Sequence, residues 1–270
     1  MPGDARPIGI FDSGVGGLTV YRALRARLPQ ESFVYLGDTA RIPYGTRSPE
    51  TVCAYARQDA AFLLACGVKL IVIACNTASS VALDLLQANS PVPVVGVIEP
   101  GARQAAAVTR CGHIGVIGTE ATMASAAYPR AIRRIAPAVR VTSQSCPLFV
   151  PLVEEGWAQH PVTVTVAAEY LTPLREAEVD TLVLGCTHYP VLADVIRRVM
   201  GEGVTLVDSG ACAAEEVVAV LEQNACFAPP GNLPAATRFC VTDASERFRR
   251  VATLCLGEEV TRLEKVRIEL

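Results

Sequence analysis

Two cysteines occur in closely similar settings in the two halves of the chain. Cys75 lies in the segment IVIACNT and Cys186 in the segment LVLGCTH. Each apolar run predicts a buried parallel strand, and the polar residues after it predict the loop that leads to the next helix. Open α/β sheets bind ligands at the carboxyl ends of their strands. Two thiols facing one substrate there could remove a proton on one side and return one on the other.

Both thiols are expected to be chemically active. Each is predicted to stand at a helix N-terminus, where the positive end of the helix dipole and free N–H groups favour the thiolate. A lone cysteine after a buried strand is usually a small core residue, but two in matching settings favour a functional pair. Core or incidental roles are expected for the other eight, Cys53, Cys66, Cys111, Cys146, Cys212, Cys226, Cys240 and Cys255.

Three ionisable residues near these segments are candidates for supporting roles. His188 follows Cys186 by two positions, where it could tune the thiol or relay its proton. Glu154 and Glu155 follow an apolar stretch at residues 147–153, so one of them could face inward. Exposure in a loop is the alternative reading, and it fits Glu155 better than Glu154.

Two loops that follow predicted strands carry further candidates. The loop DSGVGG, residues 12–17, offers close backbone approach and free N–H groups to a ligand, and its acidic first position suits an ammonium group. The alternative is a tight turn in which Asp12 or Ser13 caps the helix. The loop DTARIPYG, residues 38–45, presents Arg41 and Tyr44 as exposed-type residues. It predicts a lid over the site, and a plain surface loop is the alternative.

The elements that must position these residues alternate between strand and helix. Strands are predicted at residues 8–11, 33–36, 70–74, 92–97, 113–117, 139–143, 181–184, 204–207 and 238–242. Helices are predicted at residues 17–28, 48–66, 78–88, 121–135, 162–176, 190–200, 213–223 and 246–254. This alternation predicts an α/β fold with mainly parallel sheets and helices on both faces.

The series of elements restarts midway, which indicates two related lobes. IGIFDS at residues 8–13 resembles IGVIGT at residues 114–119, and the two cysteine segments repeat at a similar displacement. Chance similarity is the alternative, because such strand segments are common. We expect a duplicated domain with the active site in the cleft between the lobes. Lobe A would comprise residues 1–97 and 209–270, and lobe B residues 98–208.

Composition excludes several classes of protein. The 270 residues are 51% hydrophobic with a formal net charge of −3, so a full core is expected and the basic surface of a nucleic-acid binder is absent. The N-terminal residues 1–7 lack an apolar core of signal-peptide length, and no uncharged apolar stretch in the sequence is long enough for a membrane span. We therefore expect a cytoplasmic protein whose ten cysteines are thiols, and the absence of C-x-x-C pairs disfavours a zinc ribbon.

Five motifs, in order along nearly the whole chain, together resemble those of glutamate racemases in the aspartate/glutamate racemase family. They are DSGVGG at 12–17, Asp38 with PYG at 43–45, ACNTAS at 74–79, PLFVPLVE at 147–154 and GCTHYP at 185–190. The resemblance implies two pseudo-symmetric α/β lobes and interconversion of L- and D-glutamate without a cofactor or a metal. It also implies a homodimer and a supply of D-glutamate for bacterial peptidoglycan.

The resemblance further implies roles for individual residues. Cys75 would act on D-glutamate and Cys186 on L-glutamate, as a pair of acid/base thiols. Asp12 would support Cys75, and His188 would support Cys186. Glu154 corresponds to an acidic residue of the family by its position after Pro-Leu-Val.

The resemblance implies a substrate-binding set as well. Its members are Asp12, Ser13, Tyr44, Gly45, Asn76, Thr77, Thr119, Thr122, Thr187 and His188. Thr119 and Thr122 would hold a carboxylate. Arg41 departs from the residue expected at its position in the loop that precedes PYG. No lysine motif for pyridoxal phosphate stands out, so a carbanion-like state would be stabilised by fixed donors and exclusion of water.

Three other functions remain as alternatives. Aspartate racemase, or a racemase of another acid, shares the same fold, and the DSGVGG loop and His188 favour glutamate over these. A nucleotide-binding dehydrogenase is disfavoured because the G-x-G-x-x-G fingerprint is absent. A regulatory protein–protein role could coexist with catalysis, whereas a pure binding module is disfavoured by the two thiols and Asp12.

Overall fold

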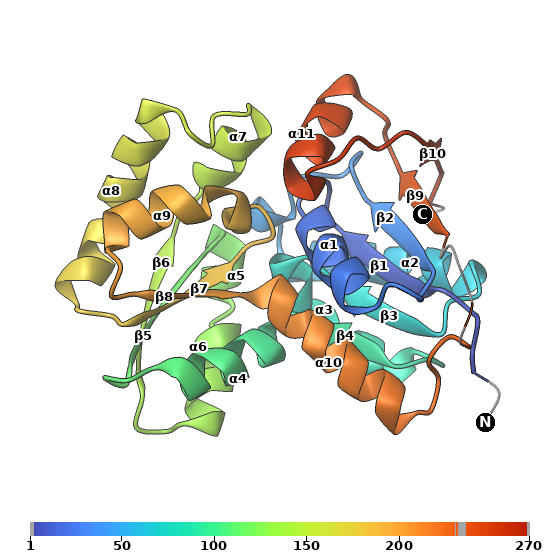
Figure 1. Ribbon diagram of the computed structural model, residues 1–270, viewed down its shortest axis with the longest axis horizontal. Helices are drawn as coiled ribbons and strands as arrows, with labels where there is room; N and C mark the ends of the chain where they lie inside the picture. Colours follow the sequence, from blue (N-terminus) through green and yellow to red (C-terminus); the bar gives the residue numbers. More distant parts are fainter. Residues whose placement is uncertain (1–2, 230, 232–235, 269–270) are drawn as a thin grey trace.

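The computed structural model describes residues 3–229, 231 and 236–268, and it divides into two lobes that lie side by side (Figure 1). Each lobe is built on its own parallel sheet. The sheet of lobe A has the order β10-β9-β2-β1-β3-β4, and that of lobe B has the order β6-β5-β7-β8. The predicted α/β class with two parallel sheets is confirmed.

The strands of lobe A are β1 (Ile8–Asp12), β2 (Phe33–Gly37), β3 (Leu70–Ile73), β4 (Val94–Gly96), β9 (Thr237–Val241) and β10 (Leu263–Lys265). Those of lobe B are β5 (His113–Gly118), β6 (Arg140–Ser145), β7 (Thr181–Gly185) and β8 (Thr205–Asp208). The order β2-β1-β3-β4 repeats as β6-β5-β7-β8, so the lobes are pseudo-symmetric. The two sequence repeats fall on equivalent strands, β1 with β5 and β3 with β7.

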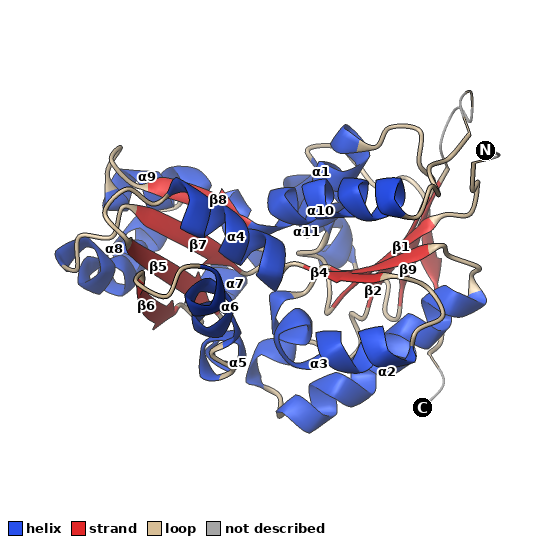
Figure 2. Ribbon diagram, turned by 90° about the horizontal axis from the view of Figure 1, so that it is seen from below, coloured by secondary structure: helices blue, strands red, loops and turns tan. Residues whose placement is uncertain are grey.

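Helices cover both faces of each sheet (Figure 2). In lobe A, one face carries α1 (Leu18–Arg27), α10 (Ser209–Gln223) and α11 (Glu246–Leu256), and the other carries α2 (Pro49–Ala65) and α3 (Asn76–Asn89). Lobe B contains α4 (Ile98–Val108), α5 (Glu120–Ala124), α6 (Ala127–Ile135), α7 (Phe149–Glu154), α8 (Pro161–Glu176) and α9 (Ala193–Met200). Short 3₁₀ turns are η1 (Tyr44–Thr46) and η2 (Tyr189–Leu192).

The apolar runs of the sequence become the central strands because they are covered on both sides. Every residue of β1, β3, β5 and β7 is buried, as expected for parallel strands between two helical layers. Helix starts are marked by local signals. Ser48 accepts a hydrogen bond from the backbone of Thr51 ahead of Pro49, and Asp208 accepts two at the start of α10.

The sequence-based elements differ from the structure at several points. The helix predicted at 121–135 is two helices, because Ala126 takes a left-handed conformation with φ of 51°. Pro129, in the first turn of the second helix, is the sequence signal for this break, since it cannot donate the hydrogen bond that a continuous helix would need. The strand predicted at 92–97 is shortened to β4. Helix α4 was not predicted, although its Pro100 lies in the first helical turn, where a proline loses no hydrogen bond. Helix α7 and strand β10 were also missed.

The chain crosses between the lobes and returns. Strand β9 pairs with β2, and β10 pairs with β9, so the last two strands extend the sheet of lobe A. The residue limits of the two lobes stay a prediction. Within the described residues, no helix has both the length and the apolar character that crossing a membrane requires.

Candidate active site

A cavity of about 280 Å³ lies where the carboxyl ends of the two sheets meet. It contains one thiol from each lobe. The predicted site residues that line it are Ser13, Tyr44, Gly45, Cys75, Asn76, Thr77, Thr119, Glu154, Cys186, Thr187 and His188. Asp12 and Thr122 are buried just behind this lining. Lining residues that were not predicted as site residues are Gly14, Ile42, Pro43, Thr46, Glu120, Pro147, Val150, Pro151 and Gly185.

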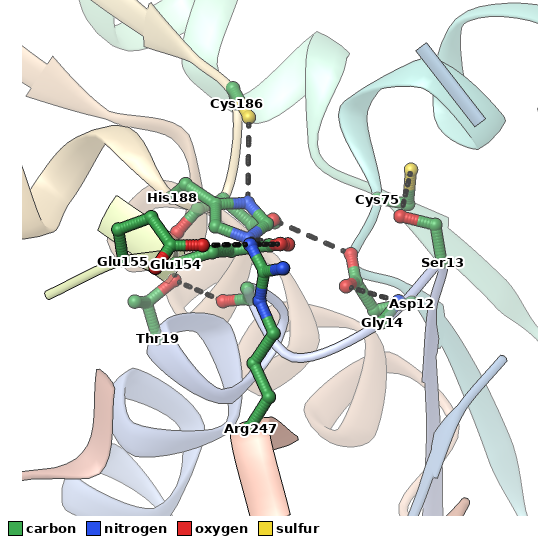
Figure 3. A network of polar contacts seen from close by, with 12 residues as sticks. Asp12, Ser13, Gly14, Thr19, Cys75, Glu154, Glu155, Cys186, His188 and Arg247 are labelled. Carbon is green, nitrogen blue, oxygen red and sulfur yellow. Dashed lines mark hydrogen bonds and ion pairs between the residues drawn. The ribbon is translucent and has the colours of Figure 1, made fainter. Parts of the chain in front are cut away.

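Cys75, at the start of α3, lies in surroundings that favour its protonated form. It is the N-cap residue of α3, with the backbone N–H of Ala78 3.5 Å from its Sγ, and its thiol donates to Ser13 Oγ at 3.7 Å (Figure 3). Burial and the negative charge of Asp12 raise the pKa of the Cys75 thiol to about 12. The expectation of a resting thiolate here is wrong, because these two effects outweigh the helix terminus.

Cys186 has a different partner. The segment after it forms η2 rather than an α-helix, so the predicted helix N-terminus is wrong. Its Sγ lies 3.8 Å from Nδ1 of His188. Burial lowers the pKa of His188, but the contacts with Cys186 and Glu154 outweigh burial and raise the pKa to about 10. At neutral pH His188 is therefore an imidazolium, and its positive charge lies beside the sulfur of Cys186.

Glu154, at the end of α7, is the acidic residue that faces inward. Its side chain is 18% exposed, whereas that of Glu155 is 51% exposed. Oε1 of Glu154 lies 3.3 Å from Nε2 of His188, an ion pair in which the imidazole N–H is not aimed well enough for a hydrogen bond. Burial raises the pKa of Glu154, but His188 and Arg247 outweigh burial and leave the pKa below its ordinary value.

Asp12 joins the two lobes rather than touching the nearer thiol. Its Oδ2 accepts a hydrogen bond from the backbone of Gly14 at 2.9 Å, and its Oδ1 accepts one from Thr187 Oγ1 at 3.4 Å. Within the described residues it forms no hydrogen bond with Cys75. A side chain at Gly16 would collide with Thr187 and His188 of lobe B. The glycine loop thus lets the lobes approach each other closely.

The loop after β2 lines the cavity, but its polar residues are not exposed. Arg41 is 15% exposed and lies 2.5 Å from Asp38 Oδ2 and 2.9 Å from Asp59 Oδ1. The Tyr44 hydroxyl donates to Asp38 and lies 3.0 Å from Asp59 Oδ2. Burial and the charge of Asp38 raise the pKa of Asp59. The expected exposure of Arg41 and Tyr44 is wrong, because both side chains turn inward to this carboxylate pair. The role of the loop as a lid stays a prediction.

Replacing Arg41 with methionine is expected to lower the free energy of unfolding by about 3 kcal/mol at pH 8. The variant leaves two buried carboxylates without a cation, so Asp59 takes up a proton more readily in the folded state. The pKa of Asp59 is raised on folding, so its proton stabilises the folded state at low pH and is lost as pH rises. Urea denaturation should therefore show that the variant loses less free energy of unfolding at about pH 5 than at about pH 8. An equal deficit at both pH values would contradict this account.

Hydroxyl and amide groups form the rest of the polar wall. The hydroxyls of Thr77, Thr119 and Thr122 lie 2.9 to 3.1 Å from one another, so the two threonines expected to hold a carboxylate form one cluster with Thr77. The Oδ1 of Asn76 accepts from the Tyr128 hydroxyl at 2.7 Å. Its Nδ2 is buried without a hydrogen-bond partner among the described residues, so it is available to a ligand.

Replacing Tyr128 with phenylalanine is expected to raise KM about tenfold with a smaller change in kcat, because Tyr128 fixes which end of the Asn76 amide serves as donor. Steady-state kinetics would measure the change. Tyr21→Phe is the matched control, since Tyr21 is equally buried but bonds Thr237 in lobe A. Equal KM values in the two variants would contradict this role.

The fold and the cavity define a two-lobed α/β protein in which each lobe supplies one thiol to a shared site. The sequence matches the Asp/Glu/hydantoin racemase family over residues 10–217, and the chain belongs to that family. Within the described residues, no group of three or more histidine, cysteine, aspartate or glutamate side chains is arranged to hold a metal ion.

Similar proteins agree over nearly the whole length. The chain is 52% identical to a glutamate racemase of Geobacter metallireducens over 98% of this chain and 97% of the relative. A glutamate racemase isoform of Bacillus anthracis superposes with a TM-score of 0.93 at 38% identity, covering 97% and 98% of the two chains. The glutamate racemase of Francisella tularensis in complex with D-glutamate gives 0.92 at 39% identity, covering 98% and 99%.

Proposed function

We propose that the protein is a glutamate racemase that interconverts L- and D-glutamate by two-base proton transfer without a cofactor. The observation that carries the proposal is the presence of one thiol from each lobe in a single cavity, in unlike surroundings. A relative at 52% identity that is named a glutamate racemase supports the substrate. D-glutamate bound in the structure from Francisella tularensis supports it as well.

The surroundings of the two thiols before substrate binds suit the conversion of L-glutamate to D-glutamate. His188 as an imidazolium favours the thiolate of Cys186, which would remove the α-proton of L-glutamate. Cys75 holds a proton that it would deliver to the opposite face, giving D-glutamate. The reverse reaction needs Cys75 as thiolate and Cys186 as thiol. The protonation of the pair therefore belongs to the site as a whole.

The remaining site groups would bind and stabilise. The threonine cluster and the Asn76 amide provide neutral donors for the carboxylates of glutamate. These fixed donors would also stabilise charge that develops on the α-carboxylate as the proton leaves. Asp12, buried between the lobes, would face the ammonium group through the glycine loop. No lysine or arginine is among the residues that line the cavity in the described structure.

The cellular role follows from the product. D-glutamate would be supplied for bacterial peptidoglycan, and we propose a cytoplasmic location and a homodimeric state. The acidic net charge argues against a nucleic-acid partner.

The function is tested by proton NMR and circular dichroism of the purified protein with L-glutamate in D₂O, without added cofactor. Loss of optical activity together with washout of the α-proton is the expected result. The same experiment with aspartate tests the rival substrate. Turnover of aspartate but not of glutamate would overturn the proposed substrate, and no exchange with either would overturn the proposed function.

A further inference from the structure

Arg247, on α11 of lobe A, reaches the acidic end of α7 in lobe B (Figure 3). Its Nη2 lies 3.1 Å from Glu154 Oε2 and 3.0 Å from Glu155 Oε1, so one nitrogen bridges two carboxylates. The other oxygen of Glu154 faces His188, which in turn contacts Cys186. A row of alternating charges therefore runs from the surface of one lobe to the thiol of the other.

We infer that Arg247 is a positioning residue for proton transfer at Cys186, acting through Glu154 and His188. The inference rests on the proposed function, because it assumes that Cys186 is one of the two acid/base thiols. Arg247 does not line the cavity and would touch no substrate. It would determine how the carboxylate that faces His188 is held and how much negative charge that carboxylate presents.

Geometry supports this role. The imidazole N–H of His188 is not aimed at Glu154, so His188 alone does not fix the orientation of the carboxylate. Arg247 holds Oε2 and thereby leaves Oε1 turned toward His188. Removing Arg247 would free the carboxylate to rotate. It would also remove a positive charge from the row and make the potential at Cys186 more negative, so both effects disfavour the thiolate.

Stability alone does not explain the contact. Arg247 is 49% exposed, and an ion pair with that exposure contributes little to folding. Glu154, however, stands on α7, whose Val150 and Pro151 also line the cavity. Arg247 contacts that helix from the opposite lobe. The charge that Glu154 presents to His188, beside Cys186, therefore depends on the relative position of the two lobes.

The first experiment uses the resting protein without substrate. Arg247→Met is compared with the unmodified chain by the rate at which iodoacetamide alkylates Cys186, measured by mass spectrometry, with the exposed Cys111 as internal standard. Alkylation of Cys186 is expected to slow about fivefold, the size of one half-exposed ion pair. Arg247→Lys keeps the charge and should recover most of the rate.

Arg250→Met is the matched control. Arg250 lies on the same helix and contacts the same end of α7, but it reaches the backbone carbonyl of Glu154 at 3.4 Å and only the side chain of Glu155. If Arg247 only held the two lobes together, Arg247→Met and Arg250→Met would slow the alkylation of Cys186 to the same extent. Equal slowing in both variants, or unchanged alkylation of Cys186 in Arg247→Met, would overturn the inference. The assay uses no substrate, so this outcome does not depend on whether the protein racemises glutamate.

The second experiment separates the two sides of the reaction. Primary isotope effects on kcat/KM are measured with α-deuterated L-glutamate and α-deuterated D-glutamate. In Arg247→Met the barrier at Cys186 rises relative to the barrier at Cys75. The isotope effect should therefore grow for the L-enantiomer and shrink for the D-enantiomer. A fall in rate with both isotope effects unchanged would overturn the inference while leaving the racemase function standing.

Discussion

Replacing either Cys75 or Cys186 with alanine is expected to lower kcat/KM for racemisation by about 10⁴-fold. The α-proton leaves from one face of the carbon and returns to the other, and the cavity offers one thiol from each lobe for these two steps. A site that keeps only one thiol can remove and restore a proton on one face alone. Circular dichroism of the reaction mixture measures the loss.

The two alanine variants should also differ from each other. In D₂O, Cys186→Ala should still exchange the α-proton of D-glutamate without inverting it, and Cys75→Ala should do the same with L-glutamate. NMR resolves this exchange. Cys240→Ala is the control, because Cys240 is buried in β9 away from the cavity and should racemise normally. Full turnover by either active-site variant would exclude the two-thiol scheme.

Replacing His188 with glutamine should reduce kcat/KM about 10²- to 10³-fold while leaving the fold intact. Glutamine keeps a hydrogen-bonding group beside Cys186 but carries no charge, so the thiolate loses its cation. In the unmodified protein His188 stays charged until pH rises through its pKa of about 10. Iodoacetamide should therefore modify Cys186 more slowly in the variant at neutral pH, with Cys111 unaffected. Unchanged alkylation of Cys186 would show that His188 does not govern its ionisation.

These kinetic predictions apply to both directions at once. The enantiomers of glutamate have equal free energies, so the two values of kcat/KM must be equal at every pH and in every variant. A substitution near one of the two thiols therefore changes kcat/KM for L-glutamate and for D-glutamate by the same factor. Which thiol's proton transfer it affects is revealed only by isotope effects, by exchange of the α-proton of one enantiomer alone, or by kcat and KM taken separately.

The sequence predicts the chemistry well where the relevant residues follow apolar strands. Cys75 and Cys186 could be recognised because a parallel strand is apolar along its length and its carboxyl end is followed at once by polar residues. The repeat of strand order between the lobes is likewise visible in the paired segments. Such signals are local, and they need no knowledge of distant contacts.

Other features depend on contacts between residues far apart in the chain, and these were missed. Arg41 looks like a surface residue until Asp59, on α2, is brought against it. Arg247 belongs to an ordinary charged helix, and nothing nearby in the sequence points to Glu154. The thiol of Cys75 was expected to ionise from its place at a helix start, but the burial and the nearby Asp12 that reverse this are properties of the assembled lobes.

The return of the chain to lobe A has a consequence for biosynthesis. Lobe B is continuous in sequence, so it can fold while the ribosome is still translating, whereas the sheet of lobe A lacks β9 until residues 237–241 emerge. Thr242, just after β9, bonds Asp38 beside the pocket, and Arg247 follows. Nascent chains would therefore carry both thiols without a finished site from the translation of Cys186 until β9 emerges, and they would expose the edge of β2 to aggregation. Activity would begin only after β9 and α11 have been translated.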